Sequence, residues 1–134
     1  MSTTENKRII ERRVEEIWNQ GKLATIDELI ATNLISNGQP SGREGFRQFV
    51  TAVRTAFPDI HFTIEDTVVE GDKVVIRYTG RGTHQGAFAG IPATGKQVQF
   101  PGIDIFRIAN GQMAEEWLMY DQLGLLQQIG ALPT

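Results

Sequence analysis

Residues 97–121 read QVQFPGIDIFRIANGQMAEEWLMYD, and this stretch decides the fold. Asn110-Gly111 is the strongest short-range signal for a β-hairpin, because both residue types tolerate the positive φ angles of a tight turn. The flanking residues are rich in β-branched and aromatic types, as strands are. We therefore expect two antiparallel strands, at about Gln97–Ile108 and Gln112–Tyr120.

The register of this hairpin distributes its side chains over two faces, with Ala109 placed opposite Gln112. One face then carries Phe100, Gly102, Asp104, Phe106, Glu115, Trp117, Met119 and Asp121, and the other carries Ile103, Ile105, Leu118 and Tyr120. Both faces are apolar, and the few helices of a small domain cannot cover both, so the second face is expected to meet another subunit. Pro101-Gly102 predicts a bulge that would curve the sheet and could shift this register by one residue.

A second hairpin precedes the first, because residues 61–78 alternate between apolar and polar types around a turn at Gly71-Asp72. In this hairpin Glu70 faces Lys73 and Asp66 faces Arg77, as ordinary cross-strand ion pairs. The glycine-rich residues 80–96 are expected to form a long connection of the kind that serves as a lid or binding loop. Their glycine spacing does not match a phosphate-binding loop, which argues against nucleotide binding.

The first half of the chain is predicted to be helical. Ser/Thr-x-x-Glu capping boxes and apolar residues at helical spacing predict helices at about residues 4–19, a short one entered at Thr25, and one from Ser41 to Phe57. A last short helix follows the strands, at residues 122–129. Helices first and strands second indicate an α+β protein, and 134 residues suit one domain that spans residues 1–134.

Composition excludes several function classes. A net charge of −3 gives no attraction to nucleic acid. The absence of cysteine and the presence of only His61 and His84 make a poor metal-ligand set, so we expect no metal. No segment approaches the ~20 apolar residues of a membrane span, and no signal-peptide core is visible, so we expect a cytoplasmic protein.

Asp104 and Asp121 are the candidate catalytic residues, because each interrupts an apolar strand or strand end and the expected register puts both on one face. A carboxyl group in an apolar pocket has a raised pKa, which suits a general base near neutral pH. Asp121 could instead be the N-cap of the last helix. Asp104 could instead form a buried ion pair with Arg77 or Arg81.

Other residues are candidates for binding a substrate. His84 could donate a hydrogen bond to a substrate carbonyl, although a solvent-exposed loop histidine is the plainer interpretation. Most members of the aromatic stripe on the third helix are expected to be ordinary core. The candidates for a pocket wall are Trp18, Phe49, Phe88, Trp117 and Met119.

Several motifs together resemble a known family. They are residues 18–21 (WNQG), 57–59 (FPD), 82–86 (GTHQG), 90–96 (GIPATGK), 102–108 (GIDIFRI), 116–117 (EW) and 121–130 (DQLGLLQQIG). Spread over nearly the whole chain, they are similar to those of the SnoaL-like polyketide cyclases, also called ester cyclases.

The resemblance implies the cone-shaped α+β fold of nuclear transport factor and ketosteroid isomerase, in which a curved antiparallel sheet wraps around N-terminal helices and encloses an apolar pocket. It also implies a homodimer and an intramolecular aldol condensation that needs neither cofactor nor metal. The family's proposed base, an aspartate just before the last helix, matches Asp121. The family's histidine on the preceding strand is replaced here by Asp104, and a loop histidine of many relatives is replaced by Asn37.

These observations lead to one expected function and several alternatives. We expect an acid/base enzyme of the polyketide-cyclase type that acts on a small hydrophobic organic molecule without a cofactor. An isomerase, dehydratase or hydrolase could use the same fold. A module that only binds a small hydrophobic ligand, with structural aspartates, is the alternative from a different class.

Overall fold

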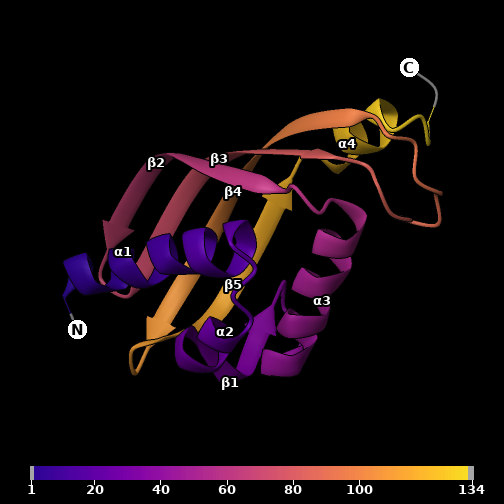
Figure 1. Ribbon diagram of the computed structural model, residues 1–134. Coiled ribbons are helices and arrows are strands. Elements are labelled where there is room, and N and C mark those ends of the chain that lie inside the picture. The colour runs from indigo at the N-terminus through magenta and orange to yellow at the C-terminus, as the bar shows by residue number, and fades with distance from the viewer. Residues whose placement is uncertain (1, 133–134) are drawn as a thin grey trace.

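The computed structural model describes residues 2–132, and its central element is a curved five-stranded sheet. The strands are β1 (Ile30–Ser36), β2 (His61–Glu70), β3 (Lys73–Thr83), β4 (Gln97–Ala109) and β5 (Gln112–Tyr120). They lie in the order β1-β5-β4-β3-β2, as Figure 1 shows. Neighbours from β2 to β5 pair antiparallel, whereas β1 pairs parallel with β5.

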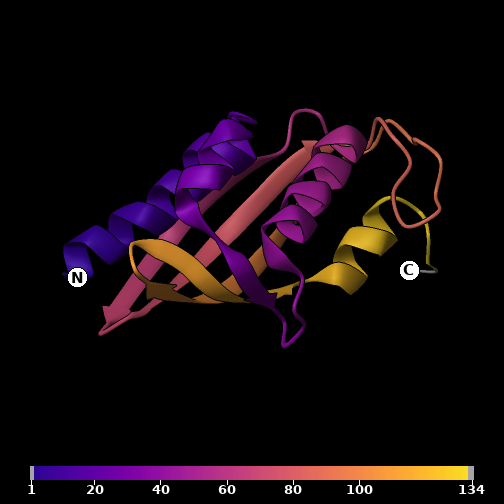
Figure 2. The ribbon, with the colours of Figure 1, turned by 90° about the horizontal axis from the view of Figure 1, so that it is seen from below.

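The helices lie on one side of this sheet. They are α1 (Thr3–Arg12), the π-helical segment η1 (Arg13–Asn19), α2 (Ala24–Leu29), α3 (Gly42–Ala56) and α4 (Gln122–Gln128). Figure 2 shows α1 and α3 above one face of the sheet, while no helix covers the opposite face. The structure thus confirms the α+β class and the curved sheet over N-terminal helices.

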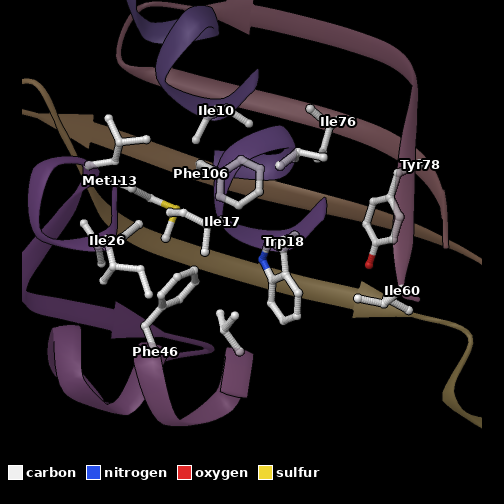
Figure 3. Close-up of a cluster of buried hydrophobic side chains, with 14 of the residues drawn as sticks. Ile10, Ile17, Trp18, Ile26, Phe46, Ile60, Ile76, Tyr78, Phe106 and Met113 are labelled. Atoms are coloured by element: carbon white, nitrogen blue, oxygen red, sulfur yellow. The ribbon is translucent and has the colours of Figure 1, made fainter. Parts of the chain in front are cut away.

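The core lies between the helices and the concave face of the sheet. Ile10, Ile17 and Ile26 from the helical layer pack with Phe106 and Met113 from the sheet, and all of them are fully buried (Figure 3). Removing such a side chain from water contributes roughly 1.5–3 kcal/mol to folding. This contact holds α1 and η1 in place across the strands.

A β-bulge at Ala114 corrects the expected register of the β4–β5 hairpin. Ala109 pairs with Gln112 as expected, but Arg107 pairs with Glu115, which leaves Ala114 as an extra residue. A bulge of one residue exchanges the two faces of the strand beyond it. Leu118 and Tyr120 therefore share the inner face with Asp104, and Trp117 and Met119 turn outward. The pairing of β4 with β3 is continuous through Pro101-Gly102, so the prediction of a bulge at these residues was wrong.

The second hairpin has the expected turn and ion pairs, with one added bulge. Glu70 pairs with Lys73, and the Arg77 guanidinium lies 2.6 Å from the Asp66 carboxylate. The register shifts between Ile64 and Asp66, which leaves Glu65 unpaired. Val68 is consequently on the outer face, where its exposed fraction is 63%.

Two further strand assignments differ from expectation. β3 continues to Thr83, so the connection covers only residues 84–96. Residue 80 of this strand must be glycine because the Phe100 ring packs directly on it, and a Cβ there would lie 2.5 Å from the ring. Ile30–Ser36 forms β1, where a helix followed by a loop was expected. This short strand at the sheet edge owes its place to pairing with β5, which local sequence does not reveal.

Only one of the expected capping boxes has a capping side chain. Ser2 Oγ accepts a hydrogen bond of 3.0 Å from the backbone N–H of Glu5. Thr25 lies inside α2 and its hydroxyl donates to Glu16, while Ser41 makes no cap hydrogen bond at the start of α3. These helices are positioned by packing of their apolar faces rather than by their caps.

The uncovered face of the sheet carries an apolar row that crosses four strands. Val68 pairs with Val75, Val75 with Ile105, and Ile105 with Trp117. Ile103 and Met119 lie next to this row, and the exposed fraction of Met119 is 72%. The apolar surface is therefore made of different β5 residues from the expected Leu118 and Tyr120, both of which point inward.

We predict that this face forms a homodimer interface. Equilibrium sedimentation at micromolar concentration should give a dimer for the wild type, because a contiguous exposed apolar patch favours association. Ile105→Glu should give a folded monomer, whereas Gln39→Glu in the exposed turn after β1 should leave the dimer intact. A wild-type monomer would contradict the prediction.

Candidate active site

A pocket of about 70 Å³ lies between the helices and the inner face of the sheet. Its wall is largely aromatic and aliphatic, with contributions from η1, α3, α4, the residue 84–96 connection and strands β2 to β5. The lining residues are Arg13, Val14, Trp18, Phe49, Val53, Phe57, Ile60, Phe62, Ile76, Tyr78, Phe88, Phe100, Asp104, Leu118, Tyr120 and Leu125. Expected wall residues Trp18, Phe49 and Phe88 are therefore brought together.

Edge-to-face contacts organise the aromatic wall. The Trp18 ring lies 5.6 Å from Phe49 and 5.3 Å from Phe62, measured between ring centroids. Phe57 makes a similar contact of 5.2 Å with Phe88. Such pairs add about 0.5–1.5 kcal/mol beyond the area that they bury. The wall is thus preformed, and it offers ring faces and edges to a flat apolar ligand.

Asp104 is the acidic group in this wall, and its exposed fraction is 3%. Burial raises the pKa of its carboxyl group to about 6, since a charge is poorly solvated in the pocket. The Arg13 charge, a 3.2 Å hydrogen bond from the Met119 backbone N–H and one from the Tyr78 hydroxyl act in the opposite direction. The nearby Glu116 charge adds to the rise in pKa.

Two tyrosines supply hydroxyl groups to the same pocket. Burial raises the pKa of both Tyr78 and Tyr120, so both remain protonated donors at neutral pH. Tyr78 crosses the neighbouring strand at Gly102, where a Cβ would lie 2.3 Å from the tyrosine hydroxyl. The glycine of the GIDIFRI motif therefore makes room for the phenol that reaches Asp104.

A buried ion pair adjoins the pocket. Arg13 Nη2 donates to Glu116 Oε1 at 3.2 Å, and Ser36 Oγ donates to Glu116 Oε2 at 2.8 Å. The Arg13 guanidinium also lies over the Phe106 ring, 4.6 Å from its centroid. Sequence reasoning missed Arg13, Tyr78, Tyr120 and Glu116. A detectable signal was the arginine at position 13, inside the apolar stripe of the first helix.

The charged neighbour of Asp104 is therefore not one of the arginines that were expected. Arg77 pairs with Asp66 on the outer face, and Arg81 is exposed on the same side of the sheet. Because Arg13 comes from the helical layer, strand register alone could not identify it.

Asp121 lies apart from Asp104. Its side chain is exposed, accepts a 2.8 Å hydrogen bond from the Gly124 backbone N–H, and caps α4. The pocket wall does not include it. The expectation that both aspartates share one face was wrong because of the bulge at Ala114. Of the two roles that the sequence left open for Asp121, the geometry favours the helix cap.

His84 is buried, contrary to the expectation of an exposed loop histidine. Its Nδ1 accepts a 3.3 Å hydrogen bond from the Thr94 backbone N–H and lies 2.9 Å from the Thr94 hydroxyl. Its ring lies 5.5 Å from that of Phe57, behind the pocket wall. His84 therefore ties together the two ends of the connection that carries Phe88.

The remaining candidates lie outside the pocket. Asn37 sits in the turn after β1 with φ of 49°, and its Oδ1 accepts a 2.7 Å hydrogen bond from the Leu118 backbone N–H. Trp117 and Met119 are on the outer face. Among residues 2–132 no group of His, Cys, Asp and Glu side chains is arranged to hold a metal ion. No helix in the described chain is long and apolar enough to span a membrane.

The buried carboxyl group of Asp104 predicts a stability that depends on pH. Its folded-state pKa of about 6 lies above that of an unfolded aspartate, so its contribution to stability is largest below about pH 4 and is lost as the pH rises to about 6. Asp104→Asn removes the free-energy cost of holding an ionised carboxylate in the pocket, and it should stabilise the protein by up to about 3 kcal/mol at pH 7.

Urea unfolding of both proteins from pH 4 to pH 7 measures this effect. The free-energy difference between them should grow across that range and be small at pH 4. A difference that is independent of pH would contradict a raised pKa at Asp104.

Comparison with known proteins adds to this geometry. The model of the family described as SnoaL-like polyketide cyclase matches residues 8–129. The aklanonic acid methyl ester cyclase DnrD of Streptomyces peucetius is 29% identical over 126 residues, which cover 89% of this chain and 87% of that protein.

Solved structures give a similar result. TsrD from Streptomyces laurentii superposes with a TM-score of 0.90 and 32% identity, over 98% of this chain and 99% of that one. IdmH from Streptomyces antibioticus, a proposed polyketide cyclase, has a TM-score of 0.83 and 31% identity, over 93% and 98% of the two chains.

Proposed function

Because the chain belongs to the SnoaL-like polyketide cyclase family, we propose that it closes a ring in a small, hydrophobic, polyketide-like molecule by acid/base chemistry without a cofactor. The observation that carries this proposal is Asp104, a titratable carboxyl group in a largely aromatic and aliphatic pocket. Homologues with named cyclase activity support a cyclase-type enzyme in general. The residues and the steps are our proposal.

Asp104 is the proton acceptor in this mechanism. Its ionised carboxylate removes a proton from a carbon next to a carbonyl, and the electron pair of that C–H bond forms an enolate. The enolate carbon attacks a second carbonyl of the same molecule and forms the new C–C bond. The proton on Asp104 then passes to the resulting alkoxide, so the enzyme returns to its starting state. A carboxyl pKa of about 6 suits both transfers near neutral pH.

The rest of the pocket supports these steps. The Tyr78 hydroxyl is within the same wall, and once Asp104 has taken up the proton this hydroxyl can donate to the oxygen on which negative charge develops. The rings of Trp18, Phe62 and Phe100 hold an aromatic or polyene substrate and exclude water from the enolate. No redox step is required, because an intramolecular aldol reaction conserves electrons.

We predict that Asp104→Asn abolishes most of the cyclisation. Aklanonic acid methyl ester, the substrate named for the related cyclases, is the first probe. Turnover should fall by ~10²–10⁴-fold, as expected for a lost acid/base group, while binding is largely retained. Exchange of the substrate's α-proton with deuterated solvent should fall in parallel, which isolates the proton-abstraction step from ring closure.

Asp121→Asn is the matched control. Asparagine is nearly isosteric with aspartate and is also a good N-cap, so α4 and turnover should both be preserved. If Asp121→Asn instead removes turnover and Asp104→Asn does not, the base is Asp121. If the wild type binds the probe and related anthraquinones without exchange or cyclisation, the chain is a ligand-binding module and the catalytic proposal fails.

A further inference from the structure

Arg13 combines two features that ordinary folding does not require. Its side chain is buried, and its Nε has no hydrogen-bond partner in the described structure. It is also the first residue of η1, where the helix widens to i→i−5 hydrogen bonds such as Gln20 N–H to Glu15 C=O. Buried unpaired donors and π-helical turns are both costly, and both occur preferentially at functional sites.

The surroundings of Arg13 fix its guanidinium without using Nε. Glu116 binds Nη2, and the Phe106 ring lies beneath the guanidinium plane. Within residues 2–132, the carboxylate within 4.0 Å of Arg13 is that of Glu116, and no ion pair joins Arg13 to Asp104. Arg13 therefore lines the pocket beside Asp104 while that carboxyl group stays free to exchange a proton.

We propose that Arg13 is an oxyanion-binding residue of this pocket, whose guanidinium N–H groups on the pocket side receive the substrate carbonyl oxygen as that oxygen becomes negatively charged. This inference rests on the proposed function, because the enolate is the anion concerned. Arg13 and Tyr78 then form a site with two hydrogen-bond donors for the developing negative charge. The guanidinium of Arg13 is the cationic donor, and the hydroxyl of Tyr78 is the neutral one. Glu116 is the positioning residue that orients Arg13 and, together with Ser36, holds it in place.

p-Nitrophenol tests the anion site without any turnover, since its ionised form mimics an enolate oxygen and absorbs visible light. We use Asp104→Asn protein to remove the neighbouring negative charge. In this background, bound p-nitrophenol should be at least about tenfold more ionised at a given pH than in a triple variant that also carries Arg13→Gln and Glu116→Gln. Replacing both partners avoids leaving the Glu116 charge unpaired in the core.

Arg77→Gln with Asp66→Asn is the matched control, because it removes an Arg–Asp pair from the outer face of the same sheet. It should leave the ionisation of the probe unchanged. Arg13→Lys keeps the charge but loses Nε–H and its planar fork, so it should restore only part of the effect. If circular dichroism shows that the protein with Arg13→Gln and Glu116→Gln is unfolded, the ionisation of p-nitrophenol is compared between the Asp104→Asn protein and the same protein with Arg13→Lys.

Cyclisation of aklanonic acid methyl ester gives the second measurement, in proteins that retain Asp104. Arg13→Gln/Glu116→Gln should lower kcat by ~10²–10³-fold with little change in KM, as for a lost oxyanion donor. Failure of the Asp104→Asn protein to bind p-nitrophenol, equal ionisation with and without Arg13, or an unchanged kcat would overturn the role of Arg13. Arg13-dependent ionisation in the Asp104→Asn background, together with a wild type that performs no cyclisation, would instead overturn the proposed function alone.

Discussion

The extra residue that β5 carries at Ala114 fixes which side chains enter the pocket. Beyond this bulge the inner face of β5 carries Glu116, Leu118 and Tyr120, opposite Phe106, Asp104 and Gly102 of β4. Without the bulge, Glu115, Trp117 and Met119 would point inward, and Trp117 instead of Leu118 would lie opposite Asp104. The β5 part of the pocket wall and the apolar outer face both follow from this one change of register.

The interior holds an unusual set of charges for so small a protein. Arg13 and Glu116 neutralise each other, which leaves Asp104 as a carboxyl group without its own counter-ion. Replacing a buried ion pair by apolar residues is often neutral or stabilising, so stability alone does not account for Arg13 and Glu116. Burial raises the pKa of the Asp104 carboxyl group to about 6, while the adjacent Arg13 charge lowers this pKa and the Glu116 charge raises it. The extensive aromatic and aliphatic core offsets the free energy that these buried charges cost.

The four antiparallel strands, most of the helices and part of the aromatic wall were predictable from sequence, because alternation, helical spacing and Asn110-Gly111 are local signals, whereas β1 was not. The bulges at Ala114 and Glu65 left no such signal, since each arises from the fit between neighbouring strands. Because the bulge at Ala114 was not predicted, Trp117, Met119 and Asp121 were assigned to the wrong face, and Glu116 and Tyr120 were not recognised as inward-pointing residues. Asp104 was identified because it interrupts an apolar strand. The partner of Glu116 lies 103 positions away in the chain, a separation that no local pattern spans.

Glycine on the inner face of the sheet shows how local preference yields to the site. Gly80 and Gly102 weaken the strands that contain them, since glycine has low strand propensity. Each one lies under a ring, Phe100 over Gly80 and Tyr78 over Gly102, at distances that no side chain would permit. The rings can therefore lie flat against the sheet, and the Tyr78 hydroxyl comes to Asp104 instead of being pushed toward the helices. At both positions strand propensity is given up, and the Phe100 and Tyr78 rings of the pocket wall occupy the space that a side chain would fill.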